Sequence, residues 1–159
     1  MRVQITKKTD GSGVLRCVRT DGSATWQKQT DRHAAYFSLH DLTHFAVETE
    51  LGYRRGFFGL IAEGWEIEDT TGKGARGPLP PEAGEVEMLV GVFSAERAGG
   101  AIWTVDEFNE CAAMSGVRKL SMDEIARVKK KRSQLFQQWA AVEPGAALDL
   151  QFTAAAARV

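Results

Sequence analysis

The chain lacks most of the motifs on which common enzyme classes depend. It has two cysteines, three histidines and four prolines among 159 residues. Cys17 and Cys111 lie far apart and form no C-x-x-C pair, so neither a zinc knuckle nor a disulfide scaffold is indicated, and we expect both to be small buried hydrophobic residues. No Gly-x-Ser-x-Gly elbow marks an activated serine, and no G-x-x-x-x-G-K-[ST] phosphate loop occurs. These absences argue against the commonest nucleophilic and nucleotide-binding sites.

An excess of charge of one sign is also missing. The chain carries 20 Lys and Arg residues against 21 Asp and Glu residues, and its net charge is -1. The molecule as a whole therefore has no attraction to nucleic acid or to anionic lipid. A basic run from Lys129 to Arg132 lies in a predicted helix, where four consecutive side chains spread around the whole turn. We interpret this run as a solvated helix surface and expect no nucleic-acid partner.

Long apolar segments are absent as well. No run approaches the length that crosses a membrane, and the N-terminus has alternating, strand-like residues where a targeting leader would have charge followed by an apolar stretch. We therefore expect a cytoplasmic protein with no membrane partner. A chain of 159 residues is within the size of one domain and buries roughly two-thirds of its unfolded surface. Residues 1–159 are accordingly expected to form a single domain.

The chain does contain clear strand patterns. Arg2 to Lys7, Val14 to Arg19 and Ala24 to Gln29 have strand-like composition, and two copies of Thr-Asp-Gly-Ser separate them. Asp-Gly provides the positive φ that tight hairpin turns need. Residues 148–152 alternate between apolar and polar side chains, which is the period of a half-buried strand. The pattern predicts an antiparallel sheet of about four strands, made of an N-terminal three-stranded meander and a C-terminal strand.

Helical patterns fill the middle of the chain. Ser38 is placed to cap a helix that begins at Leu39, and Gly52 ends that helix. Residues 70–81 are rich in glycine and proline and are expected to form a flexible exposed loop. The fold class is therefore α+β, with the sheet packed against about five helices. Besides the helix from Leu39, the predicted helices are Arg55 to Glu63, Glu85 to Ala98, and two that capping boxes open at Thr104 and Ser121.

One helix carries the only metal-capable side chains that recur at helical spacing. His40, His44 and Glu48 are four residues apart, so they share one helix face. Two neutral imidazoles and a carboxylate can coordinate a divalent ion such as zinc. Catalytic zinc normally takes three protein ligands and a water, and His33 or Glu63 could supply a further ligand if the fold returns it to this helix. The stripe therefore predicts a divalent-metal site.

The residue after His40 could take part in chemistry. Asp41 occupies the position of the general-base glutamate in His-Glu-x-x-His metallohydrolases, to which the segment HDLTH is similar. An aspartate is one methylene shorter, which is a departure from that pattern. The segment also resembles the His-Asp-x-x-His zinc motif of a ubiquinone-biosynthesis accessory family, whose downstream acid would fall at Gly56. These resemblances imply a hydrolase-like metal site with Asp41 as a base, or as an acceptor that orients a ligand.

A longer segment has a resemblance of its own. The residues from Leu39 to Gly59 include the block HDLTHFAVETELGYRRGFFG, about twenty residues long. This block resembles one that occurs in small bacterial proteins of unassigned function. The resemblance implies a bacterial family and brings no activity with it.

Two functions follow as alternatives. The first is a divalent-metal site at His40, His44 and Glu48 in a hydrolase-like or metal-binding protein. The second is a non-enzymatic interaction or structural module without a metal, in which the two histidines belong to an ordinary hydrogen-bonded helix face. In that case the free face of the sheet, or a groove beside the glycine-containing helix from Arg55 to Glu63, would bind a protein partner or a second copy in a homo-oligomer. Neither alternative names a substrate.

Overall fold

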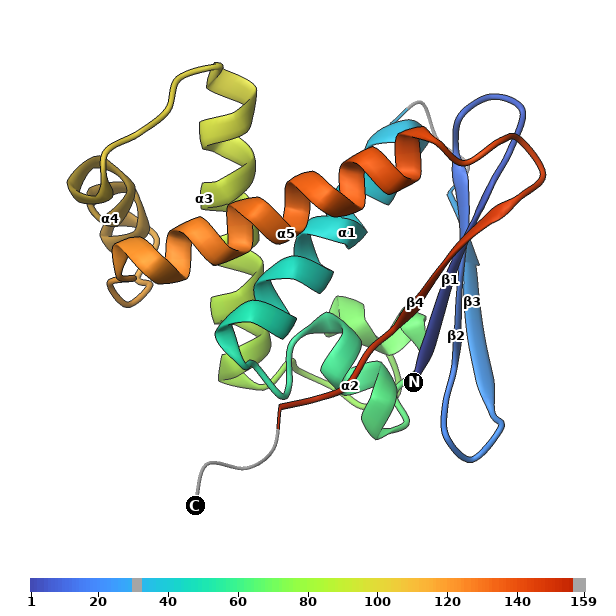
Figure 1. Cartoon of the computed structure of the whole chain (residues 1–159). Helices are drawn as coiled ribbons and strands as arrows, with labels where there is room; N and C mark the ends of the chain where they lie inside the picture. The colour runs from blue at the N-terminus through green and yellow to red at the C-terminus, as the bar shows by residue number, and fades with distance from the viewer. Residues whose placement is uncertain (30–32, 156–159) are drawn as a thin grey trace.

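The sheet and helices form separate layers. The computed structural model describes residues 1–29 and 33–155, and Figure 1 shows the sheet nearly edge-on with the helices on one side of it. All neighbouring strands are antiparallel, and the order β3-β2-β1-β4 places the C-terminal strand beside the first. The predicted α+β fold is confirmed. The strands are β1 (Arg2–Lys7), β2 (Gly13–Val18), β3 (Ala24–Lys28) and β4 (Ala147–Gln151).

The two Thr-Asp-Gly-Ser copies are the turns of the meander. In the first, the carboxylate of Asp10 accepts hydrogen bonds from the backbone N–H and the hydroxyl of Ser12. Asp21 and Ser23 repeat this arrangement in the second. The glycine of the first turn, Gly11, has φ 84°, a conformation that side chains rarely adopt. The aspartate fixes the turn and the glycine allows it, so turn chemistry sets the register of the strands.

The sheet buries one face. Val3 and Ile5 of β1 are fully buried, and Leu15 of β2 lies opposite Ile5 on the same side. The alternate residues point outward, where Gln4 lies between Asp149 and Arg16 in neighbouring strands. This alternation is what an antiparallel sheet with a single covered face requires. The outer face of the sheet is therefore polar along its centre.

In the described ranges, five α-helices and one short 3-10 helix accompany the sheet. Both predicted capping boxes are present, because Thr104 and Ser121 each accept the N–H of the glutamate three residues on, and each glutamate accepts the N–H of the capping residue. No helix in the described part of the chain is long and apolar enough to cross a membrane. The helices are α1 (Ala34–Leu51), α2 (Phe57–Glu63), η1 (Ile67–Thr71), α3 (Pro81–Gly99), α4 (Val105–Met114) and α5 (Met122–Ala140).

Two predicted helix starts were wrong. The helix of the His40 stripe begins at Ala34, not at Leu39, and Ser38 lies inside it. The Ser38 hydroxyl donates to Oε1 of Gln29 at 2.9 Å, so it links the helix to the end of β3 and caps nothing. Helix α3 begins at Pro81, since proline suits the first turn, where its missing N–H has no helical partner. The predicted loop at 70–81 is bounded by η1 and α3, and residues 72–80 have no regular structure.

Helix α1 is the centre of the fold. It packs against α3, α5 and β2, so its buried residues lie around most of its circumference. In Figure 1, α5 crosses it and α3 runs beside it, while α4 lies at the far end from the sheet. Phe45 of α1 joins Phe58 and Phe152 in a ring cluster with centroids 5.7 to 5.8 Å apart. Polar residues on α1 are consequently enclosed by other elements, which gives its histidines partners from distant parts of the chain.

Candidate metal centre

Helices α1 and α3 bring two histidines and a glutamate together. Glu87 of α3 places Oε2 2.8 Å from Nε2 of His44 and Oε1 3.5 Å from Nε2 of His40. Each of the three residues offers a ligand atom, and these atoms lie within 4.8 Å of one another. In residues 1–29 and 33–155 no other group of three or more His, Cys, Asp or Glu side chains meets this condition. We call these three residues the His-His-Glu cluster.

The cluster lies at the edge of the seam between the two helices. The His44 side chain is 4% exposed and that of His40 is 25% exposed, whereas Glu87 is 52% exposed. The two imidazoles meet edge to face with centroids 4.8 Å apart. Phe57 lies 5.5 Å from the His44 ring and Tyr36 lies 5.9 Å from the His40 ring. Aromatic walls thus shield the histidines, while the carboxylate side stays open to solvent.

The second ring nitrogens of the histidines are buried. Nδ1 of His40 and Nδ1 of His44 make no hydrogen bond to the described residues. Nδ1 of His44 lies 3.6 Å from Oε1 of Glu48, just beyond hydrogen-bond length. A histidine that binds a metal through one nitrogen usually donates the other N–H to a carboxylate or carbonyl. Glu48 is placed to be that acceptor after a small movement.

The histidines and carboxylates in and beside the cluster shift one another's pKa values. Burial lowers the pKa of His44, but the nearby carboxylates of Glu48 and Glu87 outweigh burial and raise it to about 9. Contacts with His40 and His44 hold the pKa of Glu87 well below its usual range. Without a metal, His44 is therefore an imidazolium at neutral pH. A metal ion would have to displace the proton from Nε2 of His44.

Glu48, predicted as a ligand, lies outside the cluster. Its carboxylate is buried and accepts the backbone N–H of Phe58 at 3.1 Å and that of Gly59 at 3.0 Å. These N–H groups open α2, whose own N-cap residue, Gly56, has no side chain to satisfy them. A Cβ on Gly56 would lie 2.5 Å from Cδ of Glu48. Glu48 thus caps a neighbouring helix, and glycine at 56 makes the room.

Asp41, predicted as a base, also lies outside the cluster. The residue is 8% exposed, and its Oδ2 accepts a hydrogen bond from Nε2 of Gln29 at 2.8 Å. Burial raises the pKa of Asp41 to about 6, although the nearby charges of His44 and His40 oppose that rise. Asp41 therefore places negative charge close to the imidazoles without belonging to the group of ligand atoms. Its role as a base stays a prediction.

The two further ligands suggested from sequence lie elsewhere. His33 is the residue that precedes α1, and Glu63 pairs with Arg55 at 3.0 Å. Neither belongs to the His-His-Glu cluster. The third member, Glu87, was missed because it is one of several acidic residues on the predicted helix from Glu85 to Ala98 and has no local signal of its own. Only the packing of α3 on α1 identifies it.

Comparisons with protein-family models, with curated proteins and with solved structures found no match. The resemblance of the block HDLTHFAVETELGYRRGFFG to small bacterial proteins therefore stays a prediction. Among the described residues, the His-His-Glu cluster is a group that could hold a metal ion.

Proposed function

We propose that the protein binds a divalent transition-metal ion, zinc foremost, through His40, His44 and Glu87. Two imidazole nitrogens and one carboxylate oxygen are a donor set used by catalytic zinc sites, which leave a fourth position for water or substrate. The half-exposed carboxylate of Glu87 puts that fourth position on the solvent side. Zinc in such a site lowers the pKa of a bound water and polarises a carbonyl or phosphoryl oxygen. The class of function proposed is therefore metal-dependent, and hydrolysis is the chemistry that suits it.

The contact of Glu87 with both imidazoles carries the proposal. Ligand atoms of a tetrahedral zinc site are about 3.4 Å apart when each lies about 2.1 Å from the ion. Oε1 of Glu87, at 3.5 Å from His40, matches this separation, and Oε2, at 2.8 Å from His44, is closer than it. The three ligand atoms lie within 4.8 Å of one another, so binding an ion requires them to move closer together. Glu48 would then accept the Nδ1 proton of His44, while Asp41 adds negative charge nearby.

Elemental analysis of protein purified without an affinity tag tests the proposal. After exposure to zinc and dialysis, the unmodified chain should retain about one equivalent, and the His40→Ala and His44→Ala variants should lose it. The matched control is His33→Ala, which removes the third histidine but leaves the cluster intact and should retain the ion. Less than about a tenth of an equivalent in the unmodified protein would sink the metal function.

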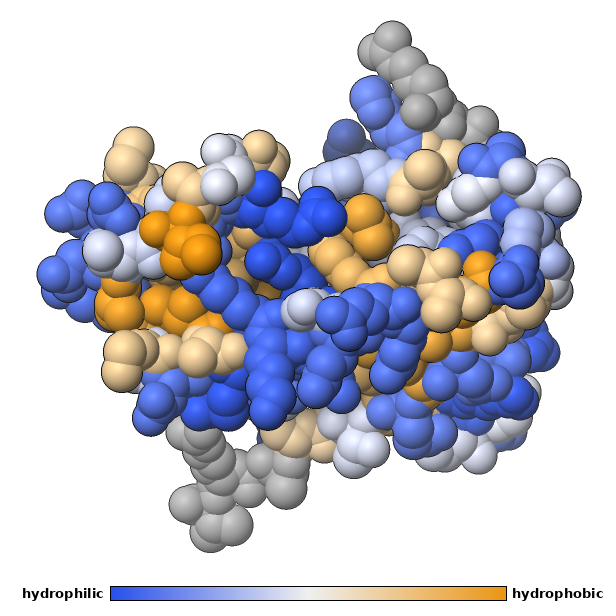
Figure 2. Space-filling view, turned by 45° about the horizontal axis from the view of Figure 1, so that its top comes forward, coloured by the Kyte–Doolittle hydropathy of each residue, from blue (hydrophilic) through white to orange (hydrophobic). Residues whose placement is uncertain are grey.

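A second candidate function is interaction with another protein chain. Several large apolar side chains are exposed: Trp26 on the outer face of the sheet is 60% exposed, Ile102 in the segment before α4 is 92% exposed, and Met114 at the end of α4 is 90% exposed. Figure 2 shows hydrophobic residues gathered on the end of the molecule that carries α4. Such patches are typical of interaction surfaces. Light scattering measures whether the protein is a monomer, and purification from its native cell extract shows whether a partner accompanies it. A strictly monomeric protein with no partner would count against this candidate.

The glycines of α2 contribute nothing to that second candidate. A Cβ on Gly59 would lie 2.0 Å from the carbonyl oxygen of Arg54, and a Cβ on Gly56 would meet Glu48. Both glycines are therefore required by close contacts within the chain. The outer face of the sheet and the end that carries α4 are the surfaces that support an interaction.

A further inference from the structure

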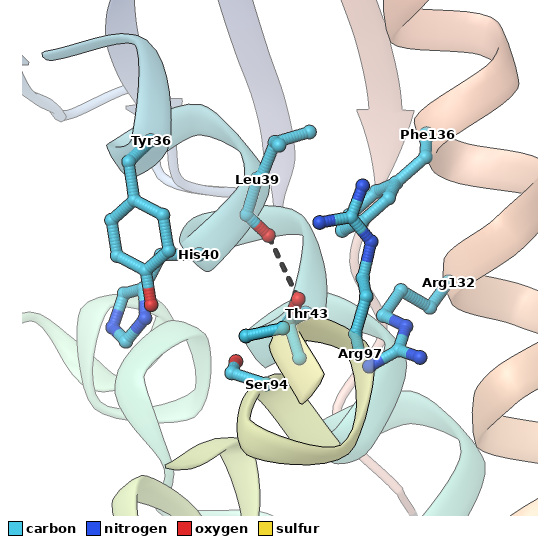
Figure 3. A pocket seen from close by; sticks show the side chains of 9 residues that line it. Tyr36, Leu39, His40, Thr43, Ser94, Arg97, Arg132 and Phe136 are labelled. Carbon is cyan, nitrogen blue, oxygen red and sulfur yellow. Dashed lines mark hydrogen bonds between the residues drawn. The ribbon is translucent and has the colours of Figure 1, made fainter. Parts of the chain in front are cut away.

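A pocket opens beside the cluster, between α1, α3 and α5. It has a volume of about 100 Å³ and is lined by His40 of α1, Ser94 and Arg97 of α3, and Arg132 and Phe136 of α5, among others. In Figure 3, His40 lies along one side of this pocket and the two arginines lie with Phe136 along the other. The volume has room for several water molecules or for one small ligand.

Both arginines are held against one aromatic ring. The guanidinium carbon of Arg97 lies 4.9 Å from the centroid of Phe136, and that of Arg132 lies 6.0 Å from the same centroid. Arg132 is 8% exposed, and its Nη1 donates to the carbonyl oxygen of Phe93 at 2.8 Å. A guanidinium has five N–H donors, so most donors of Arg132 are left for a ligand. Two cations are thus fixed at one end of a small pocket.

The charge of this pair is only partly balanced by the described residues. No described carboxylate pairs with either guanidinium. The carboxylate of Glu96 attracts the charge of Arg132, but it also accepts from Lys129 at 2.7 Å and from the N–H of Trp103 at 3.0 Å. Burial and the positive charge of Arg97 lower the pKa of Arg132. A buried cation whose charge is only partly balanced is costly, and an anion in the pocket would reduce that cost.

The sequence-based interpretation of the basic run needs correction here. Lys129 to Arg132 were expected to form a solvated helix surface, and Lys130 does so. Lys129 instead turns to Glu96 of α3, and Arg132 is buried against Phe93. The four residues spread around the helix, so the inward positions of α5 bring positive charge to α3 rather than to solvent.

We propose that this pocket binds the carboxylate or phosphate group of a small ligand, held by Arg97 and Arg132 with the hydroxyl of Ser94. Guanidinium groups suit both anions, since their planar N–H pairs match two oxygens at once. A ligand held there would have its far end beside His40. The pocket therefore makes a small anionic compound the substrate class of the metal site, and this last step rests on the proposed metal function.

Titration of metal-free protein tests the anion site by itself. The chain is treated with a chelator, dialysed into buffer of low ionic strength, and titrated in a calorimeter with inorganic phosphate and, separately, with acetate. We expect saturable binding of at least one anion, weakened about tenfold by Arg97→Gln and by Arg132→Gln because each removes a charge-assisted contact. The matched control is Lys130→Gln, an exposed neighbour in the same basic run, which should bind as the unmodified chain does.

The controls distinguish a folding defect from a loss of anion binding. Because Arg97 is exposed, its variant should fold even if the Arg132 variant does not, and circular dichroism checks both. Tighter binding of phosphate than of acetate, or the reverse, identifies the group that the ligand carries. Absence of saturable binding of both anions, or equal weakening by Lys130→Gln, overturns the pocket. Zinc retention is measured on separate samples, so failure of the metal function leaves the anion titration unchanged and the two failures can be told apart.

Discussion

Glu48 lies 3.6 Å from Nδ1 of His44 and at the same time accepts the N–H groups that open α2. One buried carboxylate therefore connects the His-His-Glu cluster to a second helix. Glu48 thus both supports the start of α2 and lies beside a histidine of the cluster.

Removal of the Glu48 carboxylate should destabilise the fold. Glu48→Ala leaves the buried N–H groups of Phe58 and Gly59 without an acceptor, so we expect a loss of about 2–4 kcal/mol in the free energy of unfolding. Glu48→Gln keeps one oxygen that can accept and should lose less. Urea denaturation of metal-free protein measures both values. Losses below about 0.5 kcal/mol for both variants would show that α2 does not depend on this cap.

The effect of a glycine-to-alanine substitution on stability should depend on the atoms that surround the glycine. Gly56→Ala and Gly59→Ala would place a Cβ 2.5 Å from the Glu48 side chain and 2.0 Å from the Arg54 carbonyl oxygen, so each should destabilise by about 2 kcal/mol or more. Gly91→Ala is the matched control, because a Cβ there meets nothing within 4 Å in the middle of α3. That variant should gain about 0.5–1 kcal/mol from helix propensity. A thermal melt of the three variants checks this order.

Stability of the metal-free protein should fall as the solution becomes alkaline. The pKa of His44 is raised to about 9, above the value near 6.5 of an unfolded histidine. A group with a raised pKa stabilises the fold fully below its unfolded pKa, and that contribution is lost as pH rises through its folded pKa. We therefore expect a decline between pH of about 6.5 and about 9, of up to about 3 kcal/mol.

The control for that decline is His44→Gln, which cannot titrate and should give a flatter profile in the same window. Asp41 affects stability at lower pH than His44 does, because burial raises the pKa of Asp41 to about 6. Its ionisation costs stability as pH rises from about 4 to about 6. Denaturant midpoints from pH 4 to pH 9.5 would contain both effects. An unchanged slope above pH 6.5 in the variant would contradict the assignment to His44.

Loss of the Glu87 carboxylate should weaken zinc binding. Glu87→Gln replaces an anionic ligand by a neutral amide, so we expect affinity for zinc to fall at least about tenfold. Glu110→Gln, an exposed change of the same type on α4, should leave the affinity unchanged. Competition with a chromophoric chelator at fixed pH measures both. Equal affinity in the two variants would remove Glu87 from the site.

Local patterns were enough to predict the strands, but they did not predict the strand order of the sheet. The Asp-Gly turns and the alternating residues are local signals, so β1 was predicted with its observed limits, Arg2–Lys7. Spacing along one helix likewise placed His40 and His44 on a common face, and they lie in contact. These features depend on neighbours in sequence, which is why they can be read from it.

Features that depend on the packing of distant elements could not be predicted from the sequence. The hydroxyl of Ser38 looks like a helix cap in sequence but donates to Gln29 across the fold. Glu48 has the spacing of a metal ligand, but its carboxylate accepts hydrogen bonds from the N–H groups at the start of α2. Glu87 and Arg132 gain their importance only where α3 meets α1 and α5. Charged residues on predicted helices look alike until the helices are placed against one another.

The position of β4 next to β1 affects how the chain can fold during synthesis. Ile5 pairs with Leu148, so the second edge of β1 is covered only by a segment far along the chain. During synthesis, one edge of β1 stays unpaired until residues 147–151 have been made. Contacts between residues this distant in sequence form slowly.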